Sequence, residues 1–303
     1  MKKIINLLTI VVICLLLTSC HQTTDNGKKN VVTTLFPIYD IVKYIGEDTI
    51  NIDLMIAPGQ DVHSYDPSTQ DIINVKKSDL LIYIGENMET WITNLNNESN
   101  NKLEIVSDER IILSSLEHHK EHDEHDHDVD MHIWTNPYYV LIMVELISKE
   151  LIKINPEYKD LYENNTNNYI EELNIIINDI TNILEHKKRN TLYFGSPFAF
   201  YYFTTAFDLD HKSVYDTCSI EVEPTIDKIM NMNKDIMENN IPVVYTKELL
   251  NNSIAKKVIE GTNAKIVLLH SGHNVSVEDF NNGVTFLDIW RNNVLALREG
   301  LLW

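Results

Sequence analysis

Short β-rich segments alternate with helix-like segments along most of this chain, and this alternation limits the folds that it can adopt. In the first half the runs NVVTTLF, TINIDLMI and DLLIYIG are each followed by a longer run of helical pattern. Short strands separated by longer helices form βαβ units around a parallel sheet. The runs TLYFGS, IPVVYT and AKIVLLH repeat the pattern in the second half. We therefore predict an α/β protein with a mainly parallel sheet, flanked by helices, in each half.

Two helical stretches separate the halves, Pro137–Asn155 and residues 156–187. At about 1.5 Å per residue, the second helix would be about 45 Å long, which is enough to run the height of a two-lobed protein. We predict an N-terminal lobe at 31–155, a connecting helix at 156–187 and a C-terminal lobe at 188–303. Because a helix is a stiff connection, we expect little motion between the lobes.

The first residues have the pattern of an export signal. Two lysines precede an apolar run from Ile4 to Leu17, which is shorter than the about twenty residues of a membrane span. The following LTSC, ending at Cys20, resembles the lipobox of bacterial lipoproteins. This resemblance implies that residues 1–19 are removed and that Cys20 carries lipid, with 20–30 as a polar tether. We therefore expect a lipid-anchored protein on the extracytoplasmic face of the cell membrane, and a plain anchor with an unmodified cysteine is the alternative.

Charge and cysteine content restrict the ligands and the means of stabilisation. The formal net charge is −20 at pH 7, so nucleic acid and anionic substrates are poor partners and a cationic ligand fits better. Cys14 would leave with the signal and Cys20 would carry lipid, which leaves Cys218 as the single possible thiol. No intramolecular disulfide can then form, and stability must come from a hydrophobic core.

The segment from Glu117 to His132 reads EHHKEHDEHDHDVDMH and holds six of the twelve histidines with seven carboxylates. Neutral imidazole is a favoured donor for Zn²⁺, and carboxylate oxygens can complete the same shell. We expect residues 117–131 to form a loop that attracts metal ions in many arrangements. A solvated acidic loop with incidental histidines is the alternative. The accessory metal ligands expected in this loop are His118, His119, His122, His125 and His127.

Three further histidines lie where an α/β fold places its ligands. His63 follows the run NIDLMI, His270 closes AKIVLLH, and His132 opens HIWTNP before a predicted helix. Ligands of open parallel sheets bind beyond the carboxyl ends of the strands, so these histidines can converge on one point. Each of them alone could be a histidine satisfied in a turn. Together, beside a histidine-rich loop, they predict a metal site formed by His63, His132 and His270.

Five motifs give the chain a specific resemblance to a known family. In order they read TTLFPIYDIVKYIG, APGQDVHSYDPS, MHIWTNP, EVEPT and VTFLDIWRNNVLALREGL, and they cover nearly all of the chain after the signal. In this order and spacing they resemble the ZnuA/TroA-like zinc and manganese solute-binding lipoproteins of bacterial ABC importers. The resemblance implies two similar lobes joined by one long rigid helix, with the metal between them. Members with a histidine-rich loop before the second ligand histidine are typically zinc carriers.

The resemblance also implies a ligand set. His63 and His132 match the two ligands of the N-terminal lobe. The third ligand of the family stands in a motif of the form GHxAF, but here FGSPFAFYYF puts Pro197 at that place, with Ser196 beside it. Proline cannot bind a metal ion, so this ligand is missing or replaced. The fourth, commonly aspartate, falls on His270. Further candidates for the open place are His273, Glu221, Glu248 and the thiol of Cys218.

The ligand set and the resemblance together favour zinc capture. A site rich in imidazole nitrogen favours Zn²⁺ over Mn²⁺, which prefers more oxygen ligands. We expect a monomeric protein, not an enzyme, that captures zinc between its lobes and delivers it to an ABC transporter permease. The alternatives are a manganese-binding protein of the same class, a zinc-dependent hydrolase and a surface adhesin, a role that this family has acquired in some hosts. Against a hydrolase, the sequence lacks HExxH, GxSxG and a P-loop.

Overall fold

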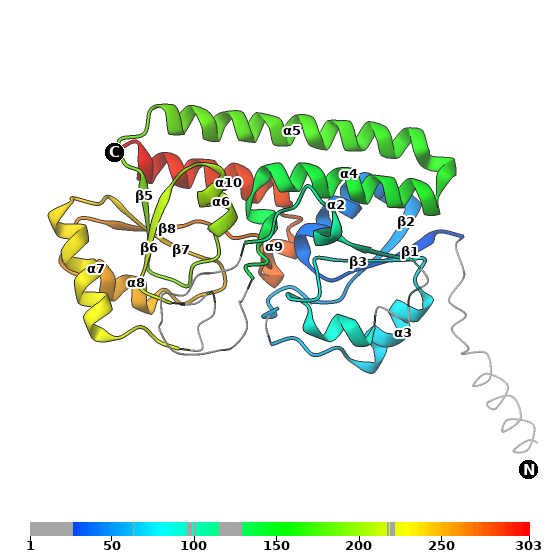
Figure 1. The fold of residues 1–303 in the computed structure, drawn as a ribbon, viewed down its shortest axis with the longest axis horizontal. Helices are drawn as coiled ribbons and strands as arrows, with labels where there is room; N and C mark the ends of the chain where they lie inside the picture. The colour runs from blue at the N-terminus through cyan, green and yellow to red at the C-terminus, as the bar shows by residue number, and fades with distance from the viewer. Residues whose placement is uncertain are drawn as a thin grey trace, which may run out of the picture.

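Two parallel sheets of four strands each organise the chain (Figure 1). The structure, a computed structural model, describes residues 27–62, 64–95, 99, 101–114, 129–216, 218 and 222–303. The signal sequence with Cys20, His63, Glu221 and the five histidines of the expected accessory loop lie outside the described residues. What the sequence predicts for them therefore stays a prediction.

The N-terminal sheet has the strand order β2-β1-β3-β4, and every neighbouring pair is parallel. Its inner strand β3 is buried along its whole length, whereas the edge strand β4 is short and partly exposed. The strands are β1 (Lys29–Thr33), β2 (Ile50–Leu54), β3 (Leu80–Tyr83) and β4 (Lys102–Glu104).

The C-terminal sheet repeats this topology with the order β6-β5-β7-β8, again with parallel neighbours throughout. Its strands are β5 (Thr191–Phe194), β6 (Asp210–Ser213), β7 (Val243–Thr246) and β8 (Lys265–Leu268). Because both sheets share one strand order, the prediction of two similar α/β lobes with parallel sheets is confirmed. The exact domain boundaries remain predictions.

Local sequence signals set the starts of the helices in the N-terminal lobe. Ser68 and Asp71 form a reciprocal capping box at the start of α3. Asn136 caps α4, and Pro137 occupies the first helical position. The helical run expected after β3 forms the short 3₁₀ turn η2 (Thr90–Asn94). The α-helices of this lobe are α2 (Phe36–Gly46), α3 (Thr69–Lys77) and α4 (Pro137–Ile154), with 3₁₀ turns η1 (Glu47–Thr49), η3 (Ile105–Ser107) and η4 (Ile133–Thr135).

One long helix, α5 (Lys159–Glu185), spans both lobes along the top of Figure 1. It follows the 3₁₀ turn η5 (Pro156–Tyr158), and at about 1.5 Å per residue it is about 40 Å long. Its buried face, which includes Tyr169, Leu173 and Ile180, packs on α4 in one lobe and on α10 in the other. The helix therefore shares its apolar face between the lobes, as the expected fold class requires.

Three helices described in the C-terminal lobe have only five or six residues. The last two helices are separated at Gly283, whose φ of 74° favours glycine. Thr285 then caps the final helix through a capping box with Asp288. The helices are α6 (Tyr201–Ala206), α7 (Ile226–Glu238), α8 (Ser253–Val258), α9 (Val277–Asn281) and α10 (Phe286–Leu301).

The lobes share a core and are joined by polar contacts. One cluster of buried apolar side chains extends from α2 and α4 through α5 to α10. Asp40 on α2 accepts a hydrogen bond of 2.9 Å from the backbone N of Phe286, the first residue of α10. Burial raises the pKa of Asp40 to about 6. The apolar cluster and this hydrogen bond thus join the two lobes.

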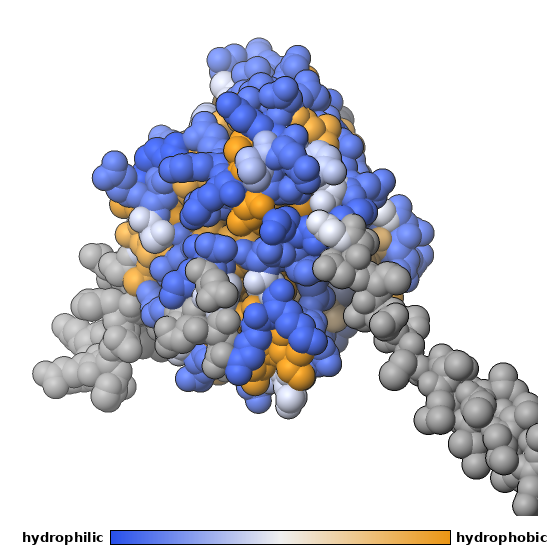
Figure 2. Space-filling model, turned by 90° about the vertical axis from the view of Figure 1, so that its right-hand side faces the viewer, coloured by the Kyte–Doolittle hydropathy of each residue, from blue (hydrophilic) through white to orange (hydrophobic). Residues whose placement is uncertain are grey.

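The surface agrees with the acidic composition. The end of the N-terminal lobe that faces the viewer in Figure 2 is mainly hydrophilic, and apolar residues form small separate patches on it. Among the residues that the structure describes, no helix combines the length and apolar character needed to cross a bilayer.

Candidate metal centre

The carboxylate of Asp130 holds His132 in one orientation. Its Oδ1 accepts a hydrogen bond from the backbone N of His132 and lies 2.8 Å from the ring Nδ1. His132 stands directly before η4, and both side chains are almost wholly buried. A carboxylate on Nδ1 fixes the tautomer and ring orientation, as it does for metal-bound histidines. A metal bond made by His132 would therefore use Nε2.

His273 from the C-terminal lobe meets His132 from the N-terminal lobe. The two ring centroids are 5.1 Å apart, and the ring planes make an angle of 76°. Trp134 packs against both rings, with centroid distances of 5.3 Å to His132 and 5.2 Å to His273. Its Nε1 donates to the backbone O of Ser271 at 2.9 Å. The two imidazoles therefore share one aromatic neighbour where the lobes join.

The segment that carries His273 is tied to the loop that precedes His63. The side-chain amide of Asn274 donates to two carbonyl oxygens of the loop 57–60, at 2.9 and 2.8 Å. A backbone hydrogen bond of 2.8 Å joins the same two segments. These bonds hold the loop 57–60 of the N-terminal lobe, which precedes His63, against the C-terminal segment that carries His273.

His270 lies in different surroundings inside the C-terminal lobe. Its Nδ1 accepts from the backbone N of Gly272 at 3.0 Å and lies 3.5 Å from Oε2 of Glu248. Its backbone N and O each bond the side chain of Asn293 at 2.8 Å. The residue also borders a small cavity lined largely by apolar side chains, among them Phe200, Phe203, Phe286 and Trp290. The described contacts thus pair His270 with Glu248.

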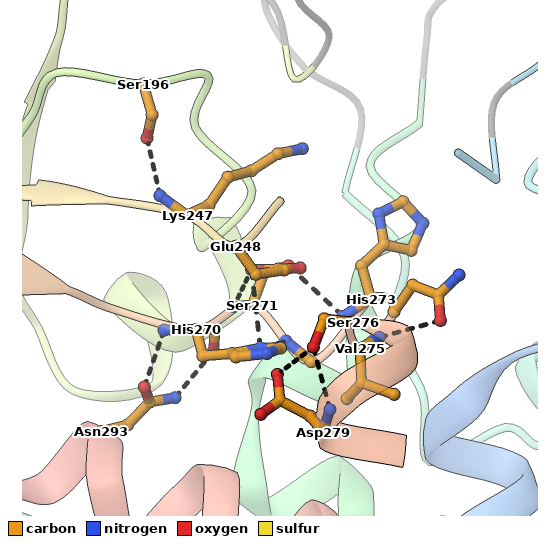
Figure 3. Close-up of polar contacts among 12 residues, drawn as sticks. Ser196, Lys247, Glu248, His270, Ser271, His273, Val275, Ser276, Asp279 and Asn293 are labelled. Carbon is orange, nitrogen blue, oxygen red and sulfur yellow. Dashed lines mark hydrogen bonds and ion pairs between the residues drawn. The ribbon is translucent and has the colours of Figure 1, made fainter. Parts of the chain in front are cut away.

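A turn at Gly272 makes the side chains of His270 and His273 point in different directions (Figure 3). Gly272 has a φ of 75°, and a Cβ at this position would lie 2.6 Å from the ring of Phe286. In Figure 3 the His273 ring projects away from the group formed by His270, Glu248 and Asn293. The sequence assigned the fourth ligand to His270 with His273 as a further candidate, but the geometry brings His273 to His132.

Glu248 is buried, and its oxygens are engaged. The backbone N of Ser271 donates to it at 2.8 Å and the Ser271 hydroxyl at 2.5 Å. Burial alone would raise the pKa of Glu248, but the nearby charges of His270 and Lys247 and the bonds from Ser271 hold it below its usual value. To bind a metal ion, this carboxylate would have to leave these partners.

The segment 195–200, where the resemblance puts a third ligand, makes hydrogen bonds and aromatic contacts within the C-terminal lobe. The hydroxyl of Ser196 accepts from the backbone N of Lys247 at 3.2 Å and donates to the carbonyl of Pro197 at 3.3 Å. Phe198 stacks on His211 of β6 with centroids 3.7 Å apart and ring planes within 4°. Burial lowers the pKa of His211. The segment 195–200 is therefore held by hydrogen bonds of Ser196 and by aromatic packing.

No group of three or more His, Cys, Asp or Glu side chains arranged to hold a metal ion occurs among the described residues. These residues supply the pair His132 and His273, and His63 lies outside them. Sequence reasoning missed Asp130 and Trp134. The spacing of Asp130, two residues before a candidate ligand, was the available signal for an orienting carboxylate.

Comparison with known protein families identifies the family of this chain. Residues 31–300 match the profile of the ZnuA family, described as zinc-uptake complex component A, periplasmic. The chain belongs to the ZnuA family. The family is one of uptake components that bind a solute, so the expectation that the chain is not an enzyme is confirmed at the level of the family.

Two relatives illustrate the range of the ZnuA family. The zinc-binding lipoprotein AdcA of Streptococcus pneumoniae is 26% identical over 307 aligned positions, which cover 99% of this chain and 61% of AdcA. The high-affinity zinc uptake system protein ZnuA of Bacillus subtilis is 28% identical over 316 positions, which cover 99% of this chain and 98% of that protein. The chain thus spans about three-fifths of AdcA but nearly all of the Bacillus protein.

Solved structures of ZnuA-like proteins share the fold. The Zn(II)-bound ZnuA-like domain of Streptococcus pneumoniae AdcA gives a TM-score of 0.77 at 24% identity, covering 91% of this chain and 100% of that one. The laminin-binding protein Lmb of Streptococcus agalactiae, described as bifunctional with adhesin and metal-transporting activity, gives 0.76 at 23% identity and covers 90% and 99%. At these identities the likeness establishes the fold alone.

Proposed function

We propose that this protein binds Zn²⁺ between its two lobes and delivers it to an ABC permease. The observation that carries the proposal is the meeting of His132 and His273, one from each lobe. An ion held about 2.0–2.1 Å from one nitrogen of each ring, in tetrahedral geometry, would set the ring centroids about 5 Å apart. The observed separation of 5.1 Å fits this requirement.

The proposed ligands are His63, His132 and His273, with water or a carboxylate in the fourth place. His63 is supported by its motif and by the bonds that tie the loop 57–60 to the segment of His273. The earlier assignment of His270 has weaker support, because its described contacts are with Glu248 and Asn293.

Zinc is favoured over manganese because all three proposed ligands are imidazole nitrogens. The names of the two relatives, a zinc-binding lipoprotein and a zinc uptake protein, support the same ion. We further propose a lipid on Cys20, a place on the extracytoplasmic face of the membrane and a monomeric state. The loop 117–131 would collect zinc near the site. The adhesin alternative, supported by the fold likeness to Lmb, remains a prediction.

The proposal is tested by metal analysis and calorimetric titration of the purified chain from residue 21 onward. We expect one tightly bound zinc ion per chain, weaker binding of Mn²⁺ and loss of the tight site in His132→Ala. Tighter binding of Mn²⁺ would support the alternative of the same class. Full zinc affinity in His132→Ala would overturn the proposed site, and turnover of an ester, peptide or phosphate substrate would favour the hydrolase.

A further inference from the structure

A tyrosine of the C-terminal lobe is bonded to the N-terminal lobe beside the proposed metal site. Tyr202 on α6 donates a hydrogen bond from its hydroxyl to the backbone O of Asp130 at 2.6 Å and accepts one from the backbone N of Ser114 at 3.1 Å. The residue is only 3% exposed, and burial raises the pKa of its hydroxyl to about 12. The hydroxyl therefore stays neutral and can donate to the carbonyl throughout the physiological pH range.

Ser114 and Asp130 also bond each other, because the backbone N of Asp130 donates to the O of Ser114 at 3.3 Å. We call this pair the stem. The Tyr202 hydroxyl bonds both of its members, so a residue from the opposite lobe fixes the backbone at Asp130. Without this contact, the carbonyl of Asp130 would have to find another donor in a buried place.

The same Asp130 orients the proposed ligand. Its backbone carbonyl is held by Tyr202, while its carboxylate holds the ring and the backbone N of His132 at 2.8 Å. Tyr202 is therefore connected to the imidazole of His132 through a single residue, Asp130, which makes one hydrogen bond to each of them. A carboxylate can hold a ligand histidine in place only if its own backbone is held.

We infer that Tyr202 is a positioning residue for the metal ligand His132 and acts through Asp130. The N-terminal half of the site is then fully ordered only when α6 of the C-terminal lobe is packed against the stem. This inference rests on the proposed function of His132 as a ligand. It adds a reason for zinc affinity to depend on contact between the lobes, beyond the ligands that each lobe supplies.

Tyr139 on α4 provides a matched control. Its hydroxyl also bonds one backbone segment twice, since it accepts from the N of Ile112 at 3.2 Å and donates to the O of Ile112 at 3.3 Å. Its ring centroid lies 5.8 Å from that of Tyr202. Tyr139→Phe therefore removes a similar hydroxyl from the same neighbourhood without touching the contacts of Asp130.

The test compares Tyr202→Phe, Tyr139→Phe, Asp130→Ala and the double variant of Tyr202 and Asp130 in the otherwise complete chain. Zinc affinity is measured by competition with a chelator, ligand geometry by the visible spectrum of the Co²⁺-loaded protein, and stability by thermal unfolding without metal. We expect Tyr202→Phe to weaken zinc binding about 10-fold, the lower end for an outer-shell partner, and to alter the Co²⁺ spectrum. Tyr139→Phe should keep the affinity within about 2-fold and leave the spectrum unchanged.

Because Tyr202 acts through Asp130, the double variant should bind zinc no more weakly than Asp130→Ala alone. Two outcomes would overturn the inference: Tyr202→Phe with the zinc affinity and Co²⁺ spectrum of the unmodified protein, whatever its stability, or fully additive losses in the double variant. His132→Ala separates this failure from failure of the proposed function. If it loses zinc while Tyr202→Phe does not, only the positioning role is rejected, and if it retains zinc, the site itself is rejected.

Discussion

The two lobes share one strand order, and each has a buried glutamate after its third strand. The surroundings of these two glutamates differ. Glu89 follows β3 and accepts three hydrogen bonds of 2.6 to 3.1 Å from neutral donors, a hydroxyl and two backbone N–H groups. Glu248 follows β7 and lies beside His270 and Lys247, with Ser271 donating to it. The same place in the topology thus has neutral hydrogen-bond donors in one lobe and basic side chains beside it in the other.

This difference acts on the two carboxyl groups in opposite directions. Burial raises the pKa of Glu89 to about 7 despite its hydrogen bonds. Glu248 is equally buried, but its neighbours hold its pKa below the usual value. A nearby cation therefore decides whether a buried carboxyl group keeps its charge near neutral pH. In the C-terminal lobe, the two basic neighbours of Glu248 are Lys247 and His270, and His270 is the residue that the sequence suggested as a metal ligand.

The largest effects on zinc affinity and stability are expected from substitutions at His270 and His273 in the C-terminal lobe. If His273 binds the metal and His270 serves Glu248, His273→Ala should weaken zinc binding by at least about 100-fold, more than loss of an outer-shell partner. His270→Ala should change the affinity by less than about 10-fold and lower stability instead. Chelator competition and chemical denaturation of both variants measure the two effects. Reversed affinities would restore His270 as the ligand.

Glu248→Ala tests the charged half of the comparison. It removes the buried acceptor of the backbone N and the hydroxyl of Ser271, so we expect a loss of about 2 to 3 kcal/mol in the free energy of unfolding. Since the folded-state pKa of Glu248 is lowered, its contribution is present above the pKa of the unfolded chain and is lost as pH falls through the folded value. Urea denaturation from pH 3 to 7 should show the variant approaching the unmodified protein at low pH. A constant difference would refute the charged pair.

Glu89→Gln tests the neutral half. The folded protein holds the proton of Glu89 more tightly than the unfolded chain, so its contribution to stability is complete below about pH 4.5 and is lost as pH rises to about 7. The amide cannot titrate, so the stability of the variant should fall by about 3 kcal/mol less between pH 4.5 and 8. Denaturation curves at both pH values measure this slope, with the exposed Glu86→Gln as the control. Equal slopes in all three proteins would contradict the raised pKa.

The smallest effect is expected from the histidine-rich loop of the N-terminal lobe. Replacing residues 117–128 by a short Gly-Ser linker keeps Ser114 and Asp130, and with them the orientation of His132. The tight site should then retain its affinity within about 3-fold, while weaker additional zinc binding is lost. Calorimetry with excess zinc distinguishes the two classes of site. A deletion that also removes Asp130 should weaken the tight site, which makes it the matched comparison.

The sequence predicted β1, β2, β3, β5, β7 and β8, because each lies in a run that is rich in apolar residues. The strands β4 and β6 were missed, and both are edge strands: β6 reads DHKS and is largely exposed. With three and four residues and few apolar side chains, these strands are too short to show the alternation that marks a half-buried strand. Helix starts with caps, as at Ser68 and Asn136, were visible in the sequence. The short length of α6 was not, because tertiary packing around Pro197 decides where that helix begins.

Within the site, the motif MHIWTNP led to His132, whose burial and carboxylate partner fit a ligand. The choice between His270 and His273 could not be made from the sequence, since the two are three residues apart at the end of one strand. The turn at Gly272, with its positive φ, directs the two side chains apart, and Gly272 is one of nine glycines that the sequence alone does not rank. The contact of Tyr202 with the N-terminal lobe could not be predicted from the sequence either, because it joins positions 72 residues apart.

The packing of Trp134 against both imidazoles gives the protein a built-in optical probe. An indole within 5.3 Å of two rings that would each gain a bond to a cation changes its electrostatic surroundings when the ion arrives. The chain has four tryptophans, and replacing the other three by phenylalanine would leave this signal alone. Its fluorescence would then record zinc entering and leaving in real time, so the kinetics of capture and release could be followed without a dye or a label.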